Sequence, residues 1–178
     1  MMSTRPMAVP FPAPSPAIEM TLEELRVAAA NPPLSVAELR RIATLPRPWE
    51  PSSCSGEMRR LIYAWLDDVV SWINEEHTWR TDRLIPHCWS EHPHIVHELA
   101  TLTCVRWEAC FAVTPASLEE WQRYTLPMFL DRISQRIGEA GCPPGRHQPS
   151  PGGGRYQLYC DGDPPMARRR RRNQDSEM

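Results

Sequence analysis

The stretch that decides the fold lies in the middle of the chain, where residues 61–73 read LIYAWLDDVVSWI. Its apolar residues recur at intervals of three and four, which is the spacing of one face of an α-helix. They are Leu61, Ile62, Trp65, Leu66, Val69, Val70, Trp72 and Ile73. The pattern predicts a helix from residue 56 to about residue 76. We expect the tryptophan series Trp65, Trp72 and Trp79 to lie mainly in the core.

A second helix is predicted to begin near Ser90, because a proline such as Pro93 is tolerated in a first helical turn. Glu91 suits the same place, beside the positive end of the helix dipole. The expected core face consists of Ile95, Leu99, Leu102, the stem of Arg106 or Trp107, and Cys110.

A third helix is predicted to open at Thr114-Pro115 or at the capping box that starts at Ser117, and to stop at Gly141. Its expected apolar face is Trp121, Tyr124, Met128, Leu130, Ile133 and Ile137. Pro127 removes a backbone hydrogen bond inside this helix, so a kink or a break is expected near Tyr124.

Two short helices are predicted before these three. The tetrapeptides at residues 21–24 (TLEE) and 35–38 (SVAE) both fit the capping box, and Pro32 and Pro46 end the two helices. They could pack on the domain or form a hairpin that binds a partner. Residues 1–20 alternate proline with small residues, which favours a disordered arm with some polyproline II character.

The predicted fold is therefore all-α, a small antiparallel three-helix bundle with two short N-terminal helices and disordered flanks. Prolines support the division, because 16 of the 20 lie outside residues 52–142. The expected organisation is a proline-rich arm (1–20), two short helices with a linker (21–55), a helical domain (56–148) and a disordered tail with an arginine run (149–178).

Composition narrows the cellular setting. No continuous apolar run near the start suggests a secretory signal or a membrane span, so we expect a cytoplasmic protein without membrane contact. In that reducing compartment the six cysteines are expected to be thiols or metal ligands and not a disulfide framework.

Positive charge is concentrated near the C-terminal end of the sequence. The net charge is −2, and an arginine run lies in the tail: Arg168, Arg169, Arg170, Arg171 and Arg172. This run could make weak, salt-sensitive contact with nucleic acid without base specificity, or it could be a solvated tail. The rest of the chain is acidic on balance and does not resemble a nucleic-acid platform.

Four residues form the main candidate site. Cys88 and His92 lie near the predicted start of the second helix, and Cys142 and His147 follow the third. Because neighbouring helices joined by a short connection run in opposite directions, both pairs should meet at one end of the bundle. Two thiolates and two imidazoles are a preferred ligand set for structural zinc.

Several alternatives to this site stay open at the level of sequence. His87 or His94 could replace one of the two histidines. Cys88 could instead pack as an apolar residue with the histidines on the surface, and a disulfide between Cys88 and Cys142 is a further, less favoured arrangement in the cytoplasm.

A second hypothesis is a metal-dependent hydrolase. His94, His97 and Glu98 lie within one turn of the second helix and could surround a metal with an open position. Their order does not match the His-Glu-x-x-His motif of zinc proteases or its inverse. The sequence also contains no Gly-x-Ser-x-Gly elbow, and its Gly152-Gly153-Gly154 lacks the lysine of a phosphate-binding loop.

Spaced single residues carry a family resemblance over about residues 61–148. They are Cys88-Trp89-x-x-His92-Pro93, Glu98-Leu99-x-x-Leu102, Trp107, Thr114-Pro115, Trp121, Leu126-Pro127-x-x-Leu130, and Cys142 with His147. This pattern resembles an actinobacterial family of small cytoplasmic proteins of unknown function, often carried on plasmids, integrative conjugative elements or phage-like islands. His94 departs from it, since some relatives have an acidic residue there. The resemblance implies a genomic setting and no chemistry.

The function expected from the sequence is a non-enzymatic helical interaction or accessory module, in keeping with a mobile genetic element, that binds another protein. The hydrolase built on His94, His97 and Glu98 is the alternative.

Overall fold

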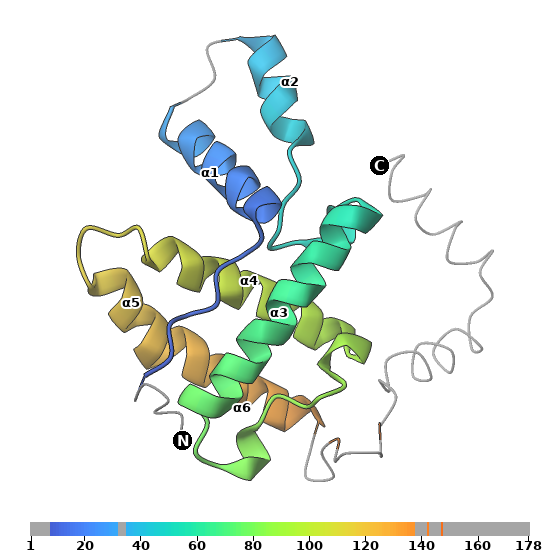
Figure 1. The fold of residues 1–178 in the computed structure, drawn as a ribbon, viewed down its shortest axis with the longest axis vertical. Coiled ribbons are helices and arrows are strands. Elements are labelled where there is room, and N and C mark those ends of the chain that lie inside the picture. The colour runs from blue at the N-terminus through green and yellow to red at the C-terminus, as the bar shows by residue number, and fades with distance from the viewer. Residues whose placement is uncertain (1–7, 32–34, 138–141, 143–146, 148–178) are drawn as a thin grey trace, which may run out of the picture. The chain divides into compact units, whose positions relative to one another are not determined.

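The computed structural model describes residues 8–31, 35–137, Cys142 and His147. Every regular element in these residues is helical (Figure 1), so the predicted all-α class is confirmed for them. The α-helices are α1 (Pro16–Ala30), α2 (Val36–Thr44), α3 (Gly56–Glu76), α4 (Pro93–Ala109), α5 (Ala116–Glu120) and α6 (Leu126–Ile137). Short 3-10 turns cover Pro51–Ser53, Thr81–Arg83 and Trp89–Glu91.

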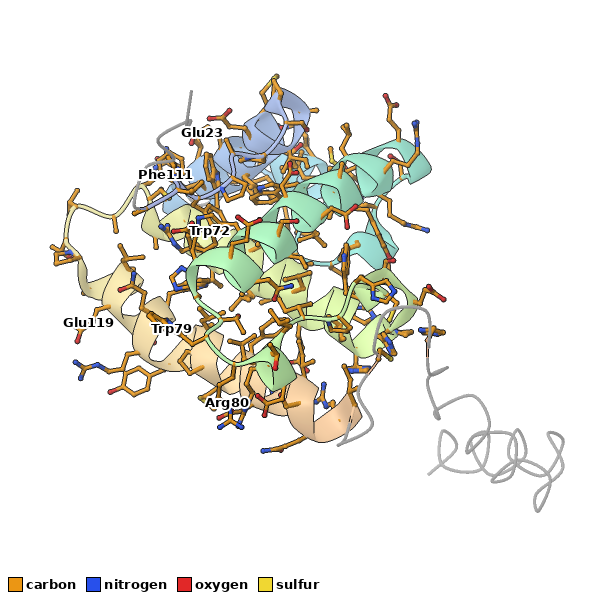
Figure 2. The ribbon with its side chains drawn as sticks, turned by 60° about the horizontal axis from the view of Figure 1, so that its bottom comes forward. Glu23, Trp72, Trp79, Arg80, Phe111 and Glu119 are labelled. Atoms are coloured by element: carbon orange, nitrogen blue, oxygen red, sulfur yellow. The ribbon has the colours of Figure 1, made fainter. Side chains whose placement is uncertain are left out.

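The central helix α3 has the bounds that the sequence predicts. The hydroxyl of Ser55 caps its start by accepting the Met58 backbone N–H at 3.3 Å. Its apolar face is buried, including Trp65 and Trp72, as the spacing indicates. The third tryptophan of the series is different: Trp79 follows the helix and is 97% exposed (Figure 2). The expectation that it lies in the core is wrong, because α3 ends at Glu76 and its periodicity ends there too.

Helix α4 begins at Pro93, three residues later than predicted, because Trp89–Glu91 form a separate 3-10 turn. Ile95, Leu99 and Leu102 are buried as expected, whereas Cys110 is exposed. In Figure 1, α4 and the segment from α5 to α6 run in opposite directions and α3 crosses both. The start of α4 therefore lies near the end of α6.

Residues Trp121–Thr125 form one π-helical turn that joins α5 to α6. The Leu126 N–H donates to the Trp121 carbonyl, five residues back instead of four. Pro127 explains the wider turn, because its ring would crowd the carbonyl of Arg123 in a regular helix. The sequence predicts a kink or a break near Tyr124, and the structure has instead a π turn there within a continuous helical segment.

The π turn also changes which residues face the core. An extra residue in the turn shifts the register of everything after it, so Leu126, Phe129 and Ile133 are buried. Tyr124 and Met128 are more than half exposed, and their predicted place on the core face is wrong. The predicted stop at Gly141 lies outside the described residues.

The N-terminal part differs most from expectation. Helix α1 begins at Pro16, not at Thr21, and the Thr21 hydroxyl donates to the Ala17 carbonyl inside the helix at 2.9 Å. The predicted disorder is thus wrong for residues 8–20, because residues 16–20 belong to α1 and the extended segment before them packs on α3, with Val9 and Phe11 against the core. For residues 16–20 the reason is that proline at a first helical position starts a helix, a role that its neighbours in the proline-rich run conceal.

The two early helices behave differently. Ile18 and Leu22 of α1 are in the hydrophobic core, so α1 packs on the domain. Helix α2 starts at the predicted cap, where Ser35 Oγ accepts the Glu38 N–H at 3.1 Å, and none of its residues is buried. In the described residues, no helix is long and apolar enough to cross a membrane.

Candidate metal centre

The segment before α4 places two of the four candidate ligands. The Pro86 carbonyl accepts the Trp89 N–H at 2.9 Å and the Trp89 carbonyl accepts the His92 N–H at 3.1 Å. This tight turn brings Cys88 Sγ to 3.4 Å from His92 Nε2. Both residues are buried. A Cys-x3-His spacing therefore forms one local pair here.

Helix α3 holds this segment in place. The side chain of Asn74 accepts the Ile85 N–H at 2.9 Å and donates to the Ile85 carbonyl at 3.0 Å. The Trp89 indole N–H donates to Asp67 Oδ1 at 2.9 Å, and the Trp89 ring stacks on Tyr63 with centroids 5.5 Å apart. Cys88 thus lies between Ile85 and Trp89, which are both held by hydrogen bonds to side chains of α3.

The second pair comes from the residues after α6. Cys142 Sγ lies 3.4 Å from His92 Nε2, and the His147 ring lies 5.0 Å from the His92 ring. Ligand atoms of Cys88, His92, Cys142 and His147 all lie within 4.8 Å of one another. The structure therefore brings together the four residues that the sequence singles out, across about fifty positions of chain.

The two sulfur-to-nitrogen distances at His92 suit a tetrahedral metal. With Zn–S near about 2.3 Å and Zn–N near about 2.0 Å, a sulfur and a nitrogen ligand are about 3.5 Å apart in a regular tetrahedron. Both sulfur-to-nitrogen distances at His92 are 3.4 Å. The same two distances also fit one imidazole N–H shared between two sulfurs, so the metal itself has to be measured.

Burial makes the cluster unfavourable for charge when no cation is present. It raises the pKa of the Cys88 thiol to about 11, and the neighbouring Cys142 adds to this effect. Burial also lowers the pKa of His92, with a further contribution from the charge of His147. A bound cation would reverse the penalty on the thiolates, because it supplies the missing positive charge.

His147 is the most exposed of the four, and it has a carboxylate beside it. Glu91 Oε2 lies 3.5 Å from His147 Nε2. A carboxylate next to the outer nitrogen of an imidazole orients the ring and raises its basicity in known metal sites. If His147 binds a metal through Nδ1, Glu91 lies where it would support the ring, a contact that the sequence pattern did not identify.

The other residues that the sequence offered as ligands, His87 and His94, lie outside the cluster of four. His87 is exposed and does not belong to the cluster. The His94 ring lies 5.8 Å from that of His92, but His94 is not part of the cluster either. In the described part of the chain no disulfide joins Cys88 to Cys142.

The three residues of the hydrolase hypothesis do not converge. Glu98 accepts hydrogen bonds from Arg132, at 2.7 Å, and from Arg136, which link α4 to α6. His97 instead lies 3.4 Å from Glu50. Among the described residues, the group able to hold a metal is the one around Cys88, so the open site at Glu98 has no support. The arginine run Arg168 to Arg172 lies outside the described residues.

No family model, curated protein or solved structure matches this chain.

Proposed function

We propose that this chain is a non-enzymatic helical interaction module, an antiparallel three-helix bundle whose end is closed by a structural zinc ion. Cys88, His92, Cys142 and His147 are the proposed ligands. The observation that carries the proposal is their convergence within 4.8 Å, two from the start of α4 and two from the residues after α6.

A structural role fits better than a catalytic one. Four protein ligands complete a tetrahedron and leave no open position for water or substrate. Three of the four are buried, so the ion would be largely shielded from solvent. Zinc in such a site supplies folding free energy, and here it would tie the chain after α6 to α4.

The cellular setting is part of the proposal and rests on the sequence. The resemblance to small actinobacterial proteins of mobile elements favours a cytoplasmic accessory protein that binds another protein. The arginine run Arg168 to Arg172 would add weak, sequence-independent contact with nucleic acid. Replacing its five arginines by alanine should reduce DNA binding and the slope of its salt dependence; an unchanged slope would exclude this contact.

Metal analysis of the purified full chain tests the zinc. We expect one zinc per chain, and Cys142→Ser should lose it together with about 3 to 5 kcal/mol of stability. The matched control is Cys110→Ser, because Cys110 is exposed and serine can keep its contact with Arg106. A metal-free wild-type chain, prepared with zinc present, or a Cys142→Ser variant of unchanged stability would contradict the proposal.

A further inference from the structure

Residues 8–15, which read AVPFPAPS, form an extended segment that lies along α3 and that we call the arm. Proline at every second position fixes φ near −65° and biases each preceding residue to an extended backbone. Ser15, at the end of the arm, has φ −62° and ψ 154°, in the polyproline II region. Such a segment satisfies few of its own backbone groups, so its carbonyls are available to a binding surface.

Two tryptophans of α3 bind those carbonyls. The Trp72 indole N–H donates to the Val9 carbonyl at 2.8 Å, and the Trp65 indole N–H donates to the Pro12 carbonyl at 2.9 Å. The register is matched: seven residues of α-helix rise about 10.5 Å, and three residues of polyproline II rise about 9.3 Å. One turn of the arm thus spans two turns of α3, in the opposite direction.

Phe11 occupies a pocket of aromatic rings and one cation. Its ring meets Trp72 and Trp65 edge-on, with centroids 5.2 Å and 6.5 Å away. The guanidinium of Arg106, from α4, lies 4.9 Å from its centroid. Arg106 Nε is buried and without a hydrogen-bond partner. Arg106 Nη1 donates to Cys110 Sγ at 3.1 Å, and the guanidinium also faces the rings of Trp72 and Trp121. At the outer end, Glu76 accepts the Val9 N–H at 3.2 Å.

These features are those of surfaces that recognise proline-rich peptides. Aromatic side chains line the groove, indole N–H groups read backbone carbonyls, and specificity resides in a pocket for one side chain. We propose that Trp65, Trp72 and Arg106 form a binding site for a proline-rich segment of a partner protein, with phenylalanine between two prolines. The arm is the intramolecular ligand that fills this site until the partner displaces it.

The arm is suited to displacement. Pro14 is its one buried residue, Val9 and Phe11 are partly buried against the core, and Ala8, Pro10 and Ala13 are exposed. The core residues Ile18 and Leu22 belong to α1, so releasing the arm leaves the core contacts of α1 in place. Segments that are mostly exposed or partly buried open at a lower free-energy cost than core helices. The inference rests on the interaction role proposed above but not on zinc.

The test uses the full chain with its arm weakened and a synthetic peptide of residues 8–15, blocked at both ends. Phe11→Ala removes the pocket ligand and leaves the groove unchanged. Binding is followed by the NMR signals of the Trp65 and Trp72 indole N–H groups. A tethered ligand competes at an effective concentration of about 1 mM, so for an arm whose own Kd is about 0.1 mM the wild-type chain should bind the peptide about tenfold more weakly than the variant.

Three controls define the result. Phe111→Ala changes an exposed phenylalanine outside the groove and should behave as wild type. A peptide with alanine in place of Phe11 should shift neither indole signal. If Phe11→Ala does not fold, Pro12→Gly in the full chain loosens the arm instead.

Two outcomes would overturn the inference. If Phe11→Ala exposes the Trp65 and Trp72 indoles but the variant does not bind the peptide, the arm is only a structural segment. Dimers of the wild-type chain that exchange arms would identify the occupant as a second copy. The zinc content is measured in the same samples. A chain that contains zinc but does not bind the peptide would contradict the peptide-binding site and leave the zinc proposal unaffected.

Discussion

His92 is the residue on which the candidate centre depends, because its Nε2 lies 3.4 Å from both Cys88 Sγ and Cys142 Sγ. His94 is a matched control two positions away, with a half-buried ring outside the cluster. We expect His92→Ala to weaken zinc binding by more than about 100-fold, since even outer supporting residues are worth about 10- to 100-fold. Competition with a chromophoric chelator measures the zinc affinity of each variant. Equal losses of zinc affinity in His92→Ala and His94→Ala would show that His92 is wrongly assigned as a zinc ligand.

His77 is a second residue with a testable charge state. It lies against Trp72 and Trp121, and its pKa is lowered by burial and by the charge of Arg106, while Glu76 acts in the opposite direction. The unfolded chain therefore binds the proton more readily than the folded one. Stability should fall as the pH drops through the ordinary value of 6.5.

Urea unfolding at several pH values measures this effect with zinc in excess. His77→Gln should lose part of the decrease in stability between about pH 7.5 and about pH 5.5. The exposed His87 provides the control, and His87→Gln should keep the full decrease. A His77→Gln curve parallel to wild type would show that His77 does not contribute.

At the scale of elements, the π turn before α6 decides which side chains reach the core. Phe129 is 1% exposed and Met128 is 57% exposed, the reverse of what a regular helix counted from Trp121 would give. Phe129→Ala should therefore cost about 3 to 5 kcal/mol, and Met128→Ala less than about 1 kcal/mol. Denaturant unfolding measures which variant loses more stability. A larger loss for Met128→Ala than for Phe129→Ala would indicate a regular helix without the π turn.

The elements show where sequence reasoning succeeds. Helix α3 has a full amphipathic pattern and a serine cap, and both of its ends are predicted. The start of α4 is missed because a 3-10 turn and the first turn of an α-helix have similar residue preferences near a proline. The register of α6 is missed because the 3.6-residue period assumes a regular helix, which Pro127 interrupts.

At the scale of the whole molecule, the antiparallel course of neighbouring helices accounts for the candidate site. Because α4 and α6 run in opposite directions, residues fifty positions apart meet, and the pairing of Cys88 and His92 with Cys142 and His147 follows from topology. The arm could not be foreseen in the same way. Its prolines indicate polyproline II, but only the spacing of Trp65 and Trp72 in three dimensions shows that α3 can bind it.

The central claim is that these two pairs hold one zinc ion, and X-ray absorption at the zinc edge of the purified full chain tests it most directly. We predict two sulfur ligands at about 2.3 Å and two imidazole nitrogens at about 2.0 Å. The His92→Ala variant should lose this signature, and His94→Ala should keep it. Zinc surrounded by oxygen and nitrogen alone, or a sulfur signal that persists when both Cys88 and Cys142 are serine, would contradict the account.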